Sequence, residues 1–128
     1  MSESRNLSYY KAGGDIFSVK NKIKAVKFGG SSLCDARSID NAAKIVLSDD
    51  SRKYIAVSAP GKRFPGDEKI TDMLYRAFMS SGDEFYGILE KIKARFDEII
   101  SGLSMPMSLD DEFSELIYGR KNYFVRDY

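Results

Sequence analysis

Two short apolar runs, each followed directly by a glycine turn, constrain the fold of this chain more than any other feature. The first run, residues 23–28, ends at Gly29-Gly30, and the second, residues 54–57, ends at the turn 58–61. Runs of this length that stop at a breaker are typical of buried strands. We therefore expect two strands, each with a tight turn at its carboxyl end.

An amphipathic stretch connects the two predicted strands. Its apolar residues Ile39, Ala42, Ala43 and Val46 have the spacing of one helix face. Residues 35–47 are therefore expected to form a helix. A strand–helix–strand crossover places its two strands parallel and right-handed, which indicates an α/β fold.

A charged loop at residues 62–68 follows the second turn, and the chain then becomes helical. The spacing of apolar residues predicts one helix over residues 70–78 and a second, of about five turns, over residues 85–99. Both apolar faces are expected to be buried. The face of the first helix consists of Ile70, Met73, Leu74, Ala77 and Phe78.

A last helix is expected near the end of the sequence. Ser108 and Asp111 have the spacing of a capping box, and Gly119 is expected to end the helix. The chain would then hold two strands and four helices. Because a parallel sheet usually has more strands and is covered on both faces, we expect a fragment of a larger domain. Residues 22–128 would form this truncated domain.

The first part of the sequence has a different character. Residues 1–21 are punctuated by Gly13-Gly14 and show no sustained apolar period. We expect a flexible N-terminal extension outside the core.

The composition excludes several kinds of chemistry. The chain has no histidine and a single cysteine, Cys34, so histidine-based nucleophilic catalysis, an intrachain disulfide and a thiolate zinc cluster are excluded. Cys34 is expected to be a packed residue. The formal net charge of +1 gives no support for binding to nucleic acid or a membrane. We expect no metal site, no secretory signal, no transmembrane helix and a cytoplasmic setting.

The end of the first strand has the residues that a phosphate site needs. Lys27 lies near the strand end, and Gly29, Gly30 and Ser31 follow in a turn that we expect to lead directly into a helix. Glycines let backbone N–H groups approach an anion, and a helix N-terminus adds further donors. Lys27 should point away from the face that carries Phe28 and could neutralise a phosphoryl group. A purely structural glycine turn is the alternative.

The second strand end should face the same region, because ligands bind at the carboxyl ends of parallel strands. Ser58 could offer a hydroxyl there, and Gly61 a close backbone approach. Thr71 would also face the crevice. The structural alternatives are a simple turn at residues 58–61 and a helix cap at Thr71 or Asp72.

These segments resemble a known family. Residues 27–33, Lys-Phe-Gly-Gly-Ser-Ser-Leu, are similar to the signature of the aspartokinases, and residues 57–62 and 69–74 resemble the next block of that family, with a charged insertion between them. The resemblance implies the N-terminal portion of a three-layer α/β amino-acid kinase fold, like that of carbamate kinase. It also implies transfer of the ATP γ-phosphoryl group to the β-carboxylate of L-aspartate, the first step toward lysine, threonine and methionine.

The resemblance also implies roles for single residues. Lys27 would stabilise the transferring group, and Phe28, Gly29, Gly30 and Ser31 would line the ATP phosphate site. The aspartate pocket would contain Ser58 and Thr71. ATP with Mg²⁺ would be the cofactor, and the full-length protein is expected to be a homo-oligomer.

Other segments of the family have no counterpart in this sequence. These include its arginine-glycine-glutamate segment, its adenosine-binding half and its regulatory domains, so we expect little or no activity from this chain alone. Two alternatives remain. One is a kinase of the same fold that acts on another carboxylate or phosphate. The other is a non-catalytic module that pairs through its open sheet edge.

Overall fold

The computed structural model describes residues 8–12, 15–19 and 23–125, with side chains described from residue 23 to residue 119. The predicted flexible extension therefore falls partly outside the described residues, at 1–7, 13–14 and 20–21. Among the described residues, no helix is both long and apolar enough to span a bilayer.

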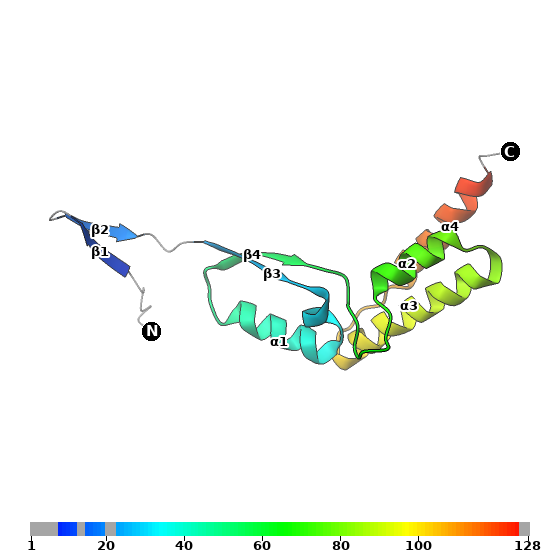
Figure 1. Ribbon diagram of the computed structural model, residues 1–128, viewed down its shortest axis with the longest axis horizontal. Coiled ribbons are helices and arrows are strands. Elements are labelled where there is room, and N and C mark those ends of the chain that lie inside the picture. The colour runs from blue at the N-terminus through cyan, green and yellow to red at the C-terminus, as the bar shows by residue number, and fades with distance from the viewer. Residues whose placement is uncertain (1–7, 13–14, 20–22, 126–128) are drawn as a thin grey trace.

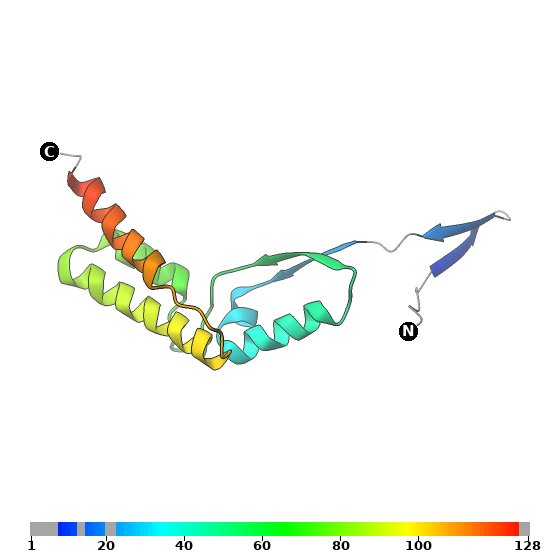
Figure 2. The same ribbon diagram turned by 180° about the vertical axis from the view of Figure 1, so that it is seen from behind.

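A parallel strand–helix–strand unit forms the centre of the structure (Figure 1), as the sequence predicts. Strand β3 (Lys24–Phe28) pairs in parallel with β4 (Arg52–Val57), and helix α1 (Ala36–Leu47) connects them. Figures 1 and 2 show α1 beside one face of the two strands. Ala42 is the buried residue of α1, and its small methyl side chain lets the helix lie close to its neighbours.

The turn after β3 differs from the prediction. A short 3-10 helix, η1 (Gly30–Leu33), follows Gly29, and α1 begins only at Ala36. The cause is local, because the Asp35 carboxylate accepts a hydrogen bond from the Ser38 N–H at 2.7 Å and caps α1 there. The glycine turn therefore leads into η1 and not directly into α1, while α1 itself agrees with the helix predicted over residues 35–47.

The hydrophobic core lies between the later helices. Helix α2 (Ile70–Met79) packs against α3 (Gly82–Gly102), and α4 (Asp110–Val125) adds one buried aromatic side chain. In Figures 1 and 2 the three helices gather beyond the carboxyl ends of β3 and β4. The buried residues of this core are Ile70, Met73, Ala77, Phe85, Ile88, Leu89, Ile92 and Phe113.

Several predicted details are corrected. Leu74 and Phe78 are 43% and 77% exposed, since only one side of α2 contacts α3. Helix α4 continues past Gly119 to Val125, because one glycine weakens a helix by about 1 kcal/mol without ending it. Its start also differs slightly, as Ser108 Oγ accepts from the Asp110 N–H at 3.1 Å rather than from Asp111.

The two central strands are more exposed than the sequence predicts. Tyr54 and Val57 of β4 are 67% and 66% exposed, and Lys24, Ala25 and Lys27 of β3 are also exposed. The prediction of buried strands is wrong for the described chain, because its β3–β4 sheet has two strands and one neighbouring helix. In a sheet of two strands with a helix on one face, apolar strand residues remain exposed because no other element packs against them.

A separate hairpin precedes this unit. Strand β1 (Ser8–Ala12) pairs antiparallel with β2 (Asp15–Val19), and Ala12 lies opposite Asp15. No strand was predicted in this part of the sequence. The signal was a two-residue Gly-Gly connection between two stretches rich in aromatic and β-branched residues, which favours a hairpin.

The position of the core generates a first prediction. Replacing Ile92, which is 2% exposed, by alanine should lower the free energy of unfolding by about 2–5 kcal/mol, because it leaves a cavity between α2 and α3. Phe78→Ala is the matched control, and its effect should stay below about 0.5 kcal/mol because the ring is exposed. Urea unfolding measures both. Equal losses for the two variants would contradict this assignment of the core.

Candidate functional site

The two glycine turns are in direct backbone contact. We name residues 29–31 the first turn and residues 58–61 the second turn. The Gly61 N–H donates a hydrogen bond to the Gly30 carbonyl oxygen at 2.8 Å. A Cβ atom at Gly61 would lie 2.7 Å from the Gly30 carbonyl carbon, so no other residue fits there without displacing the backbone. The contact joins two residues, Gly30 and Gly61, that lie 31 positions apart in the sequence.

Lys27 lies on β3 beside this contact. It is exposed and opposite Ala56 of β4, while its neighbours Val26 and Phe28 are half-buried. The alternation agrees with the predicted direction of the lysine side chain. Within residues 23–119, the Lys27 side chain forms no hydrogen bond or ion pair, so its ammonium group is not committed to a neighbouring residue there.

Ser58 meets the end of β3. Its N–H donates to the Phe28 carbonyl oxygen at 3.1 Å, which places Ser58 directly beside the start of the first turn. Its side chain is half-buried, whereas Gly29 and Ser31 are exposed. The structure thus brings Phe28, Gly29, Gly30 and Ser58 to one pair of adjoining strand ends.

Thr71 lies near the second turn because its neighbour Ile70 is bonded to that turn. Thr71 is the second residue of α2, and the Ile70 N–H donates to the Pro60 carbonyl oxygen at 3.2 Å. The N-cap of α2 is Lys69, without a capping side chain, so the capping role considered for Thr71 and Asp72 is wrong. No hydrogen bond between described residues joins Thr71 to Lys27 or Ser58.

Sequence reasoning missed a buried arginine. Arg95 of α3 is 5% exposed, and its guanidinium donates to the carbonyl oxygens of Glu68 at 2.6 Å and Gly61 at 2.7 Å. A longer contact of 3.4 Å reaches the Cys34 carbonyl oxygen. The signal was present in the sequence, because Arg95 follows Ile92 by three positions and falls on the apolar stripe of α3.

The charged loop 62–68 is held by ion pairs. Arg63 contacts both carboxylate oxygens of Asp67, at 2.8 and 3.0 Å, and also Glu98 of α3 at 3.0 Å. Arg95 lies 3.8 Å from Asp67. The Arg63 hydrogen bonds, more than any other neighbour, hold the pKa of Asp67 well below its usual range. The connection between the second turn and α2 is therefore ordered by charge.

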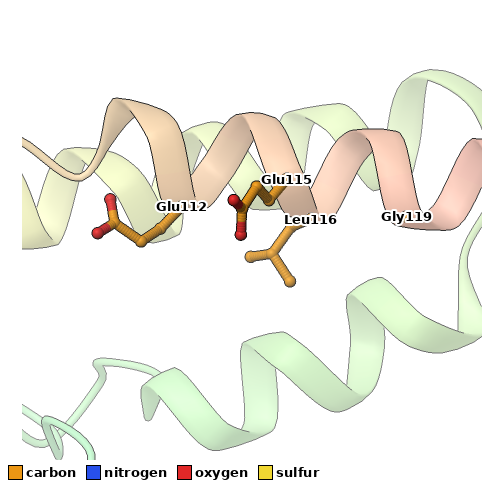
Figure 3. A pocket seen from close by; sticks show the side chains of 4 residues that line it. All are labelled: Glu112, Glu115, Leu116 and Gly119. Carbon is orange, nitrogen blue, oxygen red and sulfur yellow. The ribbon is translucent and has the colours of Figure 1, made fainter.

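Other chemistry is not evident in the described part of the chain. No group of three or more histidine, cysteine, aspartate or glutamate residues there could hold a metal ion. Cys34 is buried and unpaired with another cysteine, as expected for a packed residue. A shallow hollow lies on α4 between Glu112, Glu115, Leu116 and Gly119 (Figure 3), and none of the predicted site residues lines it.

Comparison with known proteins identifies relatives of this arrangement. No protein-family model matches the sequence. The curated protein Aspartokinase 3 of Bacillus subtilis (strain 168) is 36% identical over 106 residues, which cover 78% of this chain and 23% of that protein. This chain is homologous to part of the aspartokinases. The resemblance that the motifs indicate is thereby confirmed.

Solved aspartokinase structures confirm the α/β fold over the same limited region. The aspartate kinase of Clostridium acetobutylicum matches with a TM-score of 0.71 and 37% identity, over 79% of this chain and 24% of that enzyme. Aspartokinase III of E. coli, solved in complex with aspartate and ADP, matches with a TM-score of 0.58 and 27% identity, over 74% of this chain and 20% of that chain. The chain thus spans about a quarter of the length of the aspartokinases it matches.

The contact between the turns generates a prediction. Gly61→Ala should destabilise the fold by about 1–3 kcal/mol, since its Cβ would overlap the backbone of Gly30. Gly66→Ala is the matched control, because the nearest atom to its added Cβ is a Phe64 ring carbon at 4.0 Å. Urea unfolding of the two variants tests the contact. An unchanged stability for Gly61→Ala would refute it.

The ion pairs predict a dependence of stability on pH. The depressed pKa of Asp67 means that its contribution is present above the unfolded pKa of about 4 and is lost as the pH falls below it. Asp67→Asn should therefore be less stable than the parent chain at neutral pH, and the difference should shrink under acid. Asp50→Asn, which removes an exposed carboxylate, is the matched control. Urea unfolding across the acid range measures this, and a constant difference for Asp67→Asn would disprove it.

Proposed function

We propose that this chain forms the phosphate-binding side of an aspartate kinase site. The proposed reaction is ATP-dependent phosphorylation of the β-carboxylate of L-aspartate to 4-phospho-L-aspartate. The observation that carries the proposal is the backbone contact between Gly30 and Gly61, because it joins the two motif blocks beside Lys27. Homology to part of the aspartokinases supports it.

The proposed role of Lys27 follows from the chemistry of phosphoryl transfer. This reaction depends on positioning and on stabilisation of negative charge, which an exposed ammonium group and backbone N–H groups can supply. Lys27 has no described partner that would neutralise it. We assign Lys27 to the transferring phosphoryl group, and Phe28, Gly29, Gly30 and Ser31 to the ATP phosphates. Mg²⁺ would enter the site with ATP.

The acceptor side is proposed for Ser58 and Thr71. Their hydroxyls could donate hydrogen bonds to an aspartate molecule, and the E. coli relative was solved with aspartate and ADP bound. At neutral pH the β-carboxylate of aspartate is already ionised. It can attack the γ-phosphorus without a general base, so a chain that has no histidine is chemically suited to this step.

The exposed strands support a site completed by further residues. Tyr54, Ile55 and Val57 expose apolar surface on β4. We propose that these side chains pack against parts of a longer kinase, since the matched enzymes are about four times as long as the aligned region. In the same proposal, catalysis requires that longer protein, and the place of the reaction in lysine, threonine and methionine synthesis belongs to it.

A hybrid enzyme tests the proposal. This chain would replace the segment that it matches in the Clostridium acetobutylicum aspartate kinase, and aspartyl phosphate would be measured as its hydroxamate. The hybrid should phosphorylate L-aspartate with ATP. Lys27→Ala should lower kcat by roughly 100- to 1000-fold, as the loss of one charge-stabilising group does elsewhere. A folded hybrid without activity would contradict the proposed function.

Lys53→Ala provides the matched control for the lysine. Lys53 is an exposed lysine near the amino end of β4, away from the turns, so its loss should leave kcat unchanged. Equal activity of Lys27→Ala and Lys53→Ala would remove Lys27 from the reaction. D-aspartate, glutamate and acetylglutamate as acceptors would separate an aspartate kinase from a kinase of the same fold with another substrate.

A further inference from the structure

We propose that Arg95 is a positioning residue for this site, whose guanidinium sets the spacing between the two glycine turns. The inference rests on the proposed function, because that proposal assigns the two turns to the binding of phosphate and aspartate. It concerns a side chain of α3 that lies outside both motif blocks.

The contacts of Arg95 connect three separate segments. Its Nη2 donates to the Gly61 carbonyl oxygen at 2.7 Å and lies 3.4 Å from that of Cys34, and its Nη1 donates to the Glu68 carbonyl oxygen at 2.6 Å. Cys34 follows the first turn, Gly61 closes the second turn, and Glu68 precedes α2. The second turn and the segments that precede α1 and α2 thus each place a backbone carbonyl oxygen at the same guanidinium.

Gly61 is consequently held from two sides. Its N–H donates to Gly30, and its carbonyl oxygen accepts from Arg95. Both backbone polar groups of Gly61 are therefore committed, one to the first turn and one to α3. A shift of Gly61 would carry Gly30 with it, because the two backbones are already in contact.

The chemistry of the side chain explains why arginine suits this position. A guanidinium is planar, keeps its charge when buried and directs several N–H groups at fixed angles. A lysine ammonium is a point donor on a flexible stem and could not reach the same carbonyl oxygens in the same geometry. The carboxylate of Asp67, 3.8 Å from Arg95 and 9% exposed, supplies the negative charge that a buried cation needs.

The effect on catalysis would be indirect. Arg95 is buried, its Nη1 and Nη2 donate to backbone carbonyl oxygens, and its Nε is buried without a hydrogen-bond partner among the described residues. Because the side chain is buried, it does not contact the substrates in this arrangement. Phosphoryl transfer depends steeply on the placement of the reacting groups, and a displacement of about 1 Å can reduce the rate by roughly 100-fold. Loosening the turns should therefore lower kcat without abolishing the fold.

We call the hydrogen bonds from Arg95 to the carbonyl oxygens of Gly61 and Glu68 the clamp. Hydrogen exchange in the 128-residue chain tests whether it holds Gly61. In Arg95→Lys, exchange of the Gly61 amide should rise by at least about tenfold beyond what the loss of global stability explains. Arg95→Met is a second variant, which keeps a similar volume without a buried charge. Ile92→Val, one turn earlier on α3, is the control for simple destabilisation. If Gly61 exchange follows global stability equally in all three variants, the clamp does not exist.

Kinetics in the hybrid enzyme test the consequence for the site. For the folded fraction, Arg95→Lys should lower kcat by about 10- to 100-fold and raise KM for ATP, whereas Ile92→Val should change neither. Arg76→Met is the control for loss of a cation near the same loop, because among the described residues the Arg76 guanidinium pairs with the Glu68 carboxylate and not with a backbone carbonyl oxygen of the turns. Unchanged kcat and KM in folded Arg95→Lys would overturn the positioning role.

The two experiments separate this inference from the proposed function. An inactive parent hybrid together with a Gly61 amide that depends on Arg95 would refute the kinase proposal and, with it, the catalytic consequence, while the clamp would stand. An active parent hybrid with an unaffected Arg95→Lys variant would refute the inference alone.

Discussion

The backbone contact between Gly30 and Gly61 is the constraint on which the arrangement of the site depends. A hydrogen bond of 2.8 Å joins the two residues, and a Cβ atom at Gly61 would overlap its partner. The contact brings the carboxyl ends of β3 and β4 together at their turns, where Lys27 and Ser58 lie. The contact between Gly30 and Gly61 leaves no room for a side chain. A single methyl group added at Gly61 would therefore displace the backbone at both strand ends.

Local pattern was sufficient to predict the central unit. The apolar runs that stop at glycines and the helix face between them specify β3, α1 and β4, because each depends on neighbours a few positions away. The motif glycines were identifiable for the same reason, and the homology confirms the family that they indicate. The roles of Lys27, Ser58 and Thr71 remain predictions.

Properties that depend on tertiary contacts were not predictable from local pattern. Leu74 and Phe78 fit the helix period, but they stay exposed because α3 covers only the other side of α2. Arg95 depends on tertiary contacts in another way, because its place on the apolar stripe of α3 indicates burial, but only the fold shows that backbone carbonyl oxygens of distant segments accept from its guanidinium. Neither outcome can be read without knowing which segments meet.

Arg95 also connects the part of the chain that provides stability to the part that carries the proposed chemistry. The apolar core lies between α2, α3 and α4, whereas the exposed β3–β4 strands contribute little buried surface. A site at the ends of thin strands would be poorly fixed by those strands alone. Helix α3 has Ile92 in the core and, less than one turn later, Arg95 on the Gly61 carbonyl oxygen. Through the Arg95 side chain, the packed helical core can therefore restrict the movement of the glycine turns. This restriction gives a reason for a buried charged residue at this position.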